Sequence, residues 1–321
     1  MKMKSLVLAM STVLLSTGMA YAETNRSPET APVLYGYAQI TAGQQWGTSV
    51  DGQPSGSSGL VWGANRIRLG VKGNAVPGVN YNIEAGWDNA ALSSSAGSAR
   101  RGNLLNDGLG NSGNAAIIDA WLNYAPVPFA QLEVGKFKLP VGNEYVSLQG
   151  NRLPFVFRSM GQSLVPGRSL GAMIHARGVL GSGVGYAVGF ANDSSLDDYT
   201  AYDAALNGGE VSGGGQRGDL NGSGNYIAFA RLDYDFMGPL LHAEVSGARM
   251  SLPATDGFSS TAMYTWNAGA YGSWKGLQYT ASYTNLTSGR NFGLNGQDAF
   301  DDRGLLATDW NVGLGVNLYR M

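Results

Sequence analysis

Residues 225–236 read Asn-Tyr-Ile-Ala-Phe-Ala-Arg-Leu-Asp-Tyr-Asp-Phe. Every second residue from Tyr226 to Phe236 is apolar or aromatic, whereas Arg231 and Asp233 lie between them. Alternation with a period of two predicts a β-strand with one apolar and one polar face. The length is close to the roughly 9 to 11 residues that a tilted strand needs to cross a lipid bilayer. This stretch therefore predicts a membrane-spanning strand.

The same pattern recurs along the chain and predicts about twelve strands, although fourteen or sixteen are also compatible with it. The segments lie near 33–47, 60–73, 79–90, 115–125, 129–139, 168–178, 183–192, 225–236, 240–252, 260–274, 277–287 and 304–320. After residue 22 no apolar run is long enough for a membrane helix. The chain therefore has the repeating pattern of a sheet that crosses a membrane many times.

The connections between these segments alternate between short and long. Five are tight turns, at Val76-Pro77-Gly78, Pro126-Val127-Pro128, Leu180-Gly181-Ser182, Met237-Gly238-Pro239 and Lys275-Gly276. Six are longer polar stretches, near 48–59, 91–114, 140–167, 193–224, 253–259 and 288–303. Outer-membrane barrels have short periplasmic turns and long extracellular loops. The predicted fold class is therefore all-β, a transmembrane antiparallel β-barrel.

Residues 1–22 have the features of a secretory signal peptide. Two lysines precede an apolar stretch at 6–15, and Ala20 and Ala22 supply the small residues of a cleavage site. We therefore expect 23–321 to form the barrel. The formal net charge of −2 gives no sign of a nucleic-acid partner, and the absence of cysteine leaves backbone pairing and packing to stabilise the exported chain.

A secreted soluble β-sandwich is the alternative fold, because its outer faces would alternate in the same way. The aromatic residues argue against it, since they gather near both ends of the predicted strands in two girdles, as at two membrane interfaces. The first girdle, toward the long loops, contains Trp46, Trp87, Phe190 and Tyr283. The second girdle, toward the short turns, contains Tyr124, Tyr234, Phe236 and Trp274.

Five motifs occur in order within about a quarter of the chain. They are Asp119-Ala-Trp-Leu-Asn-Tyr124, Val134-Gly-Lys-Phe-Lys-Leu-Pro-Val-Gly142, Phe157-Arg-Ser-Met160, Pro166-Gly-Arg-Ser-Leu-Gly171 and Tyr186-Ala-Val-Gly-Phe-Ala-Asn192. In this order and spacing they resemble the phosphate-selective porin O/P family. The resemblance implies a trimeric pore in the outer membrane of a Gram-negative bacterium, with the third outer loop folded into the lumen.

In this chain the lumen loop would be 140–167, which follows the fifth predicted strand. The chain departs from the family in two respects. Family members typically have sixteen strands on a longer chain, and this sequence ends in Tyr319-Arg320-Met321 rather than in the terminal aromatic residue common in such barrels. The strand number and the register of the last strand are therefore open.

The chemistry of a pore lies in the charged side chains that line it. The expected pore-lining and constriction residues are Arg66, Arg68, Lys136, Lys138, Arg152, Arg158, Arg168, Arg177, Glu133 and Asp119. Lys136 and Lys138 break the alternation set by Leu132 and Val134, so we expect a bulge near Gly135 that turns both lysines inward.

These bases predict a mild preference for anions, because a basic narrowing stabilises an anion where water is scarcest. In the alternative interpretation the bases pair with acids and brace the loop against the wall without selecting anything. The acids available for such pairs are Glu84, Asp119, Glu133, Asp233 and Glu244. Specificity for phosphate is not expected, because 140–167 lacks a dense series of arginine or lysine.

No motif predicts catalysis, a cofactor or a metal site. Residues 108–113 match a dinucleotide-binding pattern, but they lie in a polar loop without the strand and helix that such a site requires. His175 and His242 each fall on a polar face, and no local signature places an activated serine beside them. A membrane-embedded hydrolase is therefore a distant third function.

Two functions remain. The first is a porin for passive diffusion of small hydrophilic solutes or ions, with outer-membrane lipid and the solutes as its partners. The second is a structural or partner-filled barrel with little open-pore conductance. The width of the lumen separates them in principle, because lumen size grows with strand number.

Overall fold

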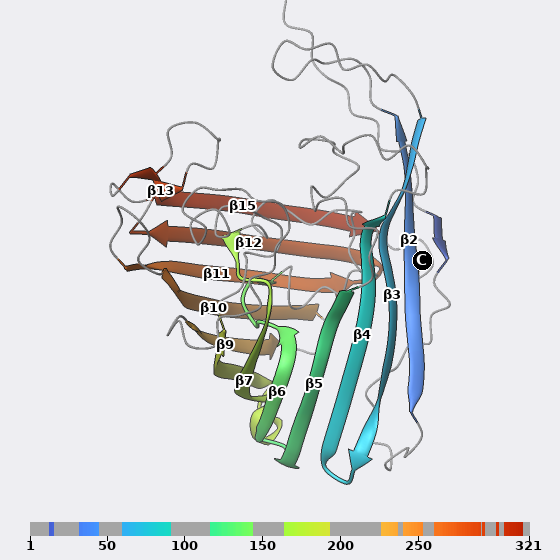
Figure 1. Ribbon diagram of the computed structural model, residues 1–321, viewed down its shortest axis with the longest axis vertical. Helices are drawn as coiled ribbons and strands as arrows, with labels where there is room; N and C mark the ends of the chain where they lie inside the picture. The colour runs from blue at the N-terminus through green and yellow to red at the C-terminus, as the bar shows by residue number, and fades with distance from the viewer. Residues whose placement is uncertain are drawn as a thin grey trace, which may run out of the picture. The chain divides into compact units, whose positions relative to one another are not determined.

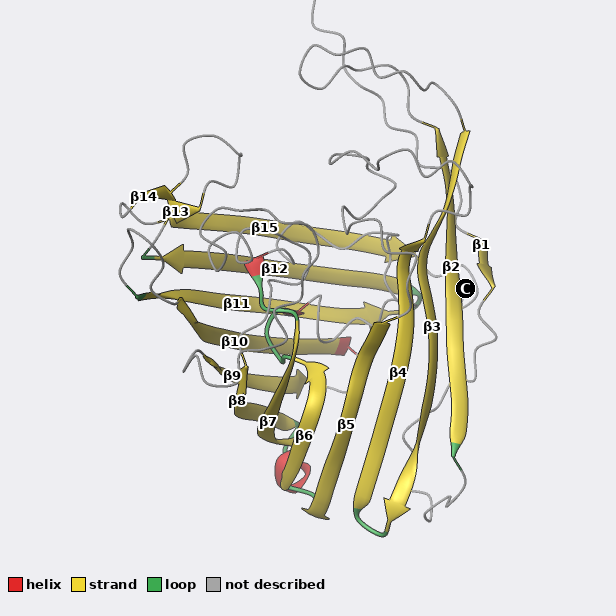
Figure 2. Ribbon diagram, viewed as in Figure 1, coloured by secondary structure: helices red, strands yellow, loops and turns green. Residues whose placement is uncertain are grey.

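The computed structural model describes residues 13–15, 32–44, 60–90, 116–143, 164–192, 226–236, 240–252, 260–289, 291–292, 300–301 and 305–316. Its fold is all-β, as predicted, and strands dominate the described part (Figure 2). One sheet contains β1 to β12 and β15 in chain order, so that neighbours in sequence are neighbours in space (Figure 1). The small strands β13 and β14 pair with each other.

The strands are β1 (Val13–Leu15), β2 (Val33–Gln44), β3 (Leu60–Val76), β4 (Val79–Ala90), β5 (Ala116–Val127), β6 (Ala130–Lys138), β7 (Arg168–Ala176), β8 (Val184–Asn192), β9 (Tyr226–Phe236), β10 (Leu241–Leu252), β11 (Thr261–Trp274), β12 (Leu277–Ser288), β13 (Asn291–Phe292), β14 (Phe300–Asp301) and β15 (Leu305–Val316). The twelve predicted strands are thus confirmed as β2 to β12 and β15. Within the described residues, no helix has the length and apolar character needed to span a membrane.

The chain divides into two compact units, which are described separately. The first contains residues 1–25, 34–70 and 84–117. In it, the buried guanidinium of Arg68 lies with Nε 3.2 Å from Glu84 Oε1. The hydroxyl of Tyr35 donates a hydrogen bond of 2.9 Å to Glu84 Oε2. This carboxylate therefore links side chains of β2, β3 and β4.

The second unit contains residues 26–33, 71–83 and 118–321, and its strands carry different side chains on their two faces. One face, here called the outer face, exposes large apolar side chains. They include Leu122, Leu132, Val134, Leu170, Ile174, Val188, Phe190, Leu232, Val245 and Trp266. The opposite, inner face carries most of the buried polar and charged residues. The alternation read from the sequence of β9 therefore corresponds to a real division of faces.

The predicted aromatic girdles can be followed where side chains are described. Tyr124, Tyr234, Phe236 and Trp274 are exposed at the short-turn ends of their strands. Phe190 is exposed on β8, and Tyr283 contacts Trp310 with ring centroids 4.4 Å apart. Trp46 and the side chain of Trp87 lie outside the described part of the chain.

The short turns have the backbone that their residues predict. Lys275 has φ +46° and Gly276 has φ +85°, and these two residues connect β11 to β12. Two consecutive residues with positive φ match the twist of a tight β-hairpin. The expected turn at Pro126-Val127-Pro128 begins later, since β5 continues to Val127 and its register with β6 shifts between Tyr124 and Val127.

The bulge expected near Gly135 is absent. Gly135 has φ +126°, yet the pairing of β6 keeps its register through this residue with both β5 and β7. Two residues further along β6, on the same face as Gly135, the ring of Phe137 is buried in an apolar cluster on the inner face. Lys136 lies in register with Leu170, whose side chain is exposed on the outer face. The pairing therefore does not turn Lys136 inward as we expected.

Candidate functional site

The candidate site is the inner face of the second unit where the two ends of the segment 140–167 meet the sheet. The described ends are 139–143 and 164–167, here called the two limbs of the loop. Leu139 and Val141 on the first limb are fully buried, and Leu164 and Val165 on the second limb are nearly so. Both limbs therefore pack against the sheet instead of extending away from its edge.

The apolar side chains of the limbs enter one cluster with side chains from distant strands. The partners are Phe137, Ala191, Ile227, Phe229, Ala248, Met250, Met263 and Leu286. The rings of Phe137 and Phe229 meet edge to face with centroids 6.3 Å apart. Such apolar residues on an otherwise polar face are explained by the limbs, because each would face water without them.

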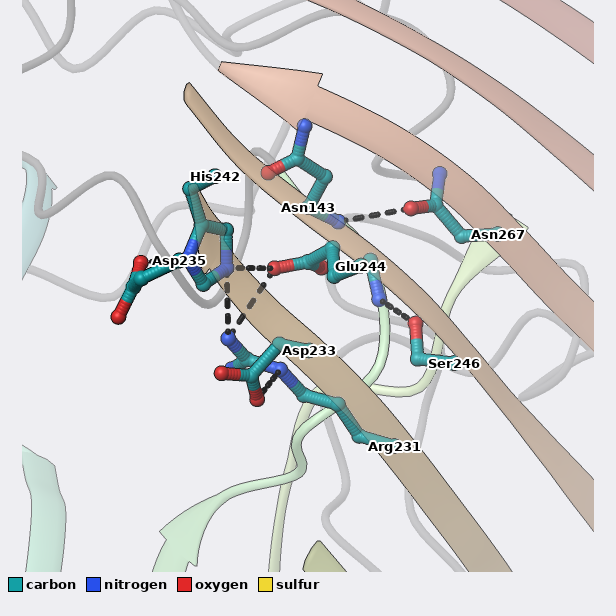
Figure 3. Close-up of polar contacts among 9 residues, drawn as sticks. Asn143, Arg231, Asp233, Asp235, His242, Glu244, Ser246 and Asn267 are labelled. Carbon is teal, nitrogen blue, oxygen red and sulfur yellow. Dashed lines mark hydrogen bonds and ion pairs between the residues drawn. The ribbon is translucent and has the colours of Figure 1, made fainter. Parts of the chain in front are cut away.

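Polar contacts hold the limbs at defined positions, and Figure 3 shows those of the first limb. The backbone N–H of Gly142 donates to Ser246 Oγ at 3.0 Å on β10. The backbone N–H of Asn143 donates to Asn267 Oδ1 at 2.9 Å on β11. On the second limb, Leu164 accepts a hydrogen bond of 2.7 Å at its carbonyl oxygen from Thr265 Oγ1. Short polar side chains on the wall thus satisfy backbone groups that the limbs bury.

Asn267 is itself fixed by its neighbours. Its Nδ2 donates to Thr284 Oγ1 at 2.8 Å and to the carbonyl oxygen of Tyr283 at 3.1 Å, which leaves Oδ1 facing the limb. Two positions further along β11, Gly269 provides space for Asn143. A Cβ at this glycine would lie 2.8 Å from Asn143 Cβ. The wall is therefore shaped to receive this residue.

A charged cluster lies on β9 and β10 beside the first limb (Figure 3). Arg231 is its centre, with Nε 3.1 Å from Asp233 Oδ1 and Nη2 3.1 Å from Glu244 Oε2. His242 Nε2 lies 3.4 Å from Glu244 Oε2, and its Nδ1 lies 2.6 Å from Asp235 Oδ1. Asp235 is half-exposed and the other four side chains are buried. We call these five residues the Arg231 cluster.

The Arg231 cluster is acidic in sum. Three carboxylates face one guanidinium and one imidazole, so its formal charge is −2 with neutral His242 and −1 with protonated His242. Its members are occupied with one another, and the cluster contains no serine or other hydroxyl nucleophile. This arrangement braces two strands and gives the wall a negative field, which favours cations over anions nearby.

A smaller polar group lies on the inner face of β5 to β7 near the short turns. His175 Nε2 lies 3.7 Å from Glu133 Oε2 and 3.1 Å from Asn123 Oδ1. Asn123 Nδ2 donates to Gln131 Oε1 at 2.8 Å. The group joins three neighbouring strands through their inward polar side chains.

The residues predicted to line the constriction are not all brought together. Arg168 begins β7 at the long-loop end, where its Nε lies 2.8 Å from Asp119 Oδ1. Arg177 is exposed just beyond the other end of β7, about 30 Å along the strand from Arg168. Glu133 belongs to the group near the short turns. Arg177 and Glu133 therefore lie far from the limbs.

The other predicted residues are placed in part. Arg68 is paired with Glu84 in the first unit. Lys136 and Lys138 are half-buried on β6. Arg152, Arg158 and the side chain of Arg66 lie outside the described part of the chain.

Sequence reasoning used Asp233 and Glu244 only as acids available for ion pairs and did not identify the cluster around Arg231. A signal for it exists, because a tight turn pairs the polar face of 225–236 with that of 240–252. In the structure His242 lies opposite Asp235, and Glu244 lies opposite Asp233. Pairing the two segments through their turn would have brought these charges together.

Comparison with known proteins agrees with this fold. A family model described as phosphate-selective porin O and P matches residues 39–226. No curated protein sequence matches the chain. Among solved structures, Salmonella typhi OmpF in complex with daunomycin is 12% identical with a TM-score of 0.54, over 88% of this chain and 73% of that chain.

Two further solved structures are less similar. Vibrio cholerae OmpT in a trimer form is 9% identical with a TM-score of 0.40, over 88% of this chain and 83% of that chain. A triple mutant of Rhodopseudomonas blastica porin is 10% identical with a TM-score of 0.39, over 88% of this chain and 97% of that chain.

Proposed function

Because the chain belongs to the family of phosphate-selective porins O and P, it is an outer-membrane channel protein, and we propose that it conducts small hydrophilic solutes or ions by passive diffusion. The observation that carries the proposal is the anchoring of both limbs of 140–167 on the inner face. With both limbs held on the wall, we expect 140–167 to form a fixed narrowing of the lumen. We further propose that removal of 1–22, which takes the short edge strand β1 with it, precedes assembly. We also propose that the channel forms a trimer, as the family resemblance implies.

We propose that any preference for anions is mild and rests on Arg152 and Arg158. Arg168 and Arg231 are weaker candidates for this role, because each has a carboxylate within 3.1 Å. A base beside a carboxylate adds little net field to the lumen. The Arg231 cluster, with its net negative charge, opposes an anion preference. The remaining predicted residues, apart from Lys136, keep a proposed lining role, and no enzymatic role is proposed.

The test is a measurement of single-channel conductance and reversal potential under a salt gradient. The mature chain, Arg152→Ala, Arg158→Ala and the control Lys275→Ala are refolded and inserted into planar bilayers. We expect conductance steps and a reversal potential toward the anion equilibrium value that weakens in both arginine variants and not in the control. If conductance steps appear but neither arginine variant changes the reversal potential, the proposed role of Arg152 and Arg158 in anion preference is wrong. A folded barrel without steps would refute the diffusion pore and favour a plugged or partner-filled one.

A further inference from the structure

Arg249 is an arginine on the outer face of the second unit. Its neighbours Ala248 and Met250 are buried in the apolar cluster of the inner face, so the alternation of the strand turns Arg249 outward. The register agrees, because Arg249 lies opposite Tyr264, whose side chain is half-exposed. A charged side chain on the lipid-facing side of a membrane sheet requires an explanation.

The described side chains around Arg249 are aromatic or hydroxylic, and none of them is a carboxylate. Its Nη1 donates to Tyr226 Oη at 3.2 Å and to Ser251 Oγ at 3.3 Å. Its guanidinium carbon lies 5.5 Å from the centroid of the Tyr226 ring. Among the described side chains no acid pairs with it, in contrast to Arg168 and Arg231. Within the described part of the chain, the charge is therefore held in place by uncharged groups.

Arg249 lies near the long-loop end of its strand. It is eight residues from Leu241, the first residue of β10, which corresponds to about 19 Å across the membrane for a strand tilted by about 45°. The apolar band of such barrels is about 25 Å tall. Aromatic residues mark this level, since Phe190 contacts Tyr226 with centroids 6.0 Å apart. Arg249 thus lies on the outer side of the bilayer centre, and its long side chain reaches toward the outer interface, where it contacts Ser251.

At the outer interface the phosphates of the lipid headgroups offer a counter-charge to this guanidinium. An arginine on the lipid face costs little free energy near the interface and considerably more at the midplane. Its planar fork matches two oxygens of one phosphate, and Nε and Nη2 donate to no described protein group. The Tyr226 ring beside the fork supplies an apolar surface for acyl chains and sugar.

We propose that Arg249, Tyr226 and Tyr264 form a binding site for the phosphate of a phosphorylated glycolipid in the outer leaflet. The site lies on the lipid-facing side of the sheet and is separate from the lumen. The proposal rests on the location of the chain in the outer membrane and not on whether its pore conducts. A failure to conduct would therefore leave it untouched.

The experiment compares two glycolipids on the refolded mature chain. The protein is placed in phosphatidylcholine nanodiscs that contain either phosphorylated lipid A or the same lipid after enzymatic removal of its phosphates, and retained glycolipid is measured by native mass spectrometry. We expect the phosphorylated form to be retained and the dephosphorylated form to be lost. Equal retention of both forms by the unmodified chain would overturn the proposal.

Three variants locate the site. Arg249→Gln should weaken retention about tenfold, because it removes charge-assisted hydrogen bonds, whereas Arg249→Lys should retain part of it. The control is Lys275→Gln, which removes a cation held 5.0 Å from the Trp274 ring at the short-turn end, and should leave retention unchanged. An equal loss in Lys275→Gln would indicate general charge attraction. Such an equal loss would refute the site. Displacement of the glycolipid by inorganic phosphate would also refute it, and so would a changed oligomeric state in Arg249→Gln.

Discussion

Arg231 and Glu244 form a buried ion pair that crosses between strands on the diagonal. Their Nη2 and Oε2 atoms are 3.1 Å apart, although Arg231 lies opposite Ser246 and Glu244 lies opposite Asp233. The contact therefore joins positions of β9 and β10 that are two residues apart in register. The guanidinium of Arg231 thus forms ion pairs with two carboxylates, those of Asp233 and Glu244.

Arg231→Gln is therefore expected to lower the free energy of unfolding by about 3–5 kcal/mol, because it leaves buried carboxylates without their cation. The measurement is urea unfolding of the protein folded in lipid vesicles. The double variant Arg231→Gln with Glu244→Gln should recover part of the loss, and Arg177→Gln, at an exposed arginine, should lose less than 1 kcal/mol. Equal losses in the single and double variants would contradict the assigned pairing.

Gly269→Ala is expected to displace the first limb, since the new Cβ would lie 2.8 Å from Asn143 Cβ. We expect faster cleavage of 140–167 by an added protease and a changed single-channel conductance. Asn143→Gly in the same chain should restore the original cleavage rate and conductance, because it removes the side chain that clashes with the new Cβ. Gly178→Ala, where no atom lies within 4 Å of the new Cβ, is a control for an added methyl away from the limbs, although its φ of +62° adds backbone strain. If Asn143→Gly fails to restore the limb, the contact is not the cause.

Gly135→Ala should destabilise the barrel more than an ordinary glycine substitution. Its φ is +126°, and a Cβ there would lie 2.7 Å from Trp121 Cα on the neighbouring strand. Backbone strain of this kind costs about 1–3 kcal/mol before the steric clash is added. The check is the yield of heat-modifiable folded protein after refolding, compared with Gly178→Ala, whose left-handed φ costs about 1–2 kcal/mol alone. Similar yields for both variants would show that the strand relaxes around the added methyl.

Asp119→Asn should shift the reversal potential toward the anion equilibrium value, because it removes the carboxylate 2.8 Å from Arg168 Nε at the long-loop end. Arg168→Gln should shift it in the opposite direction, and the double variant should lie near the unmodified channel. Reversal potentials under a salt gradient measure all three. If neither single variant changes the potential, this pair lies outside the ion path.

The strands could be predicted almost in full, because period-two alternation and Gly-Pro turns are local signals. The segment 79–90 matches β4 residue for residue. The error at Pro126 has a local cause as well. Proline lacks an N–H for the ladder, which suggests a turn, yet β5 tolerates it by shifting register and continues to Val127.

The site could be predicted only in part, because its contacts join residues far apart in the chain. Alternation places Ser246 and Asn267 on the inner face, but it does not reveal that they meet Gly142 and Asn143 more than 100 residues earlier. The expectation for Lys136 failed for a related reason. The glycine at 135 was interpreted as an inserted residue, whereas its positive φ is accommodated without a change of pairing.

The two anchored limbs have a consequence for how such a channel can diversify. Each limb has its own apolar and polar contacts with the sheet, so residues 144–163 are tethered at both ends by fixed points. For a tethered loop, each doubling of length adds only about 0.6 kcal/mol of closure entropy. Insertions, deletions and charge changes between the tethers are therefore nearly independent of wall stability. Evolution or design can exchange this interval for another while keeping one scaffold.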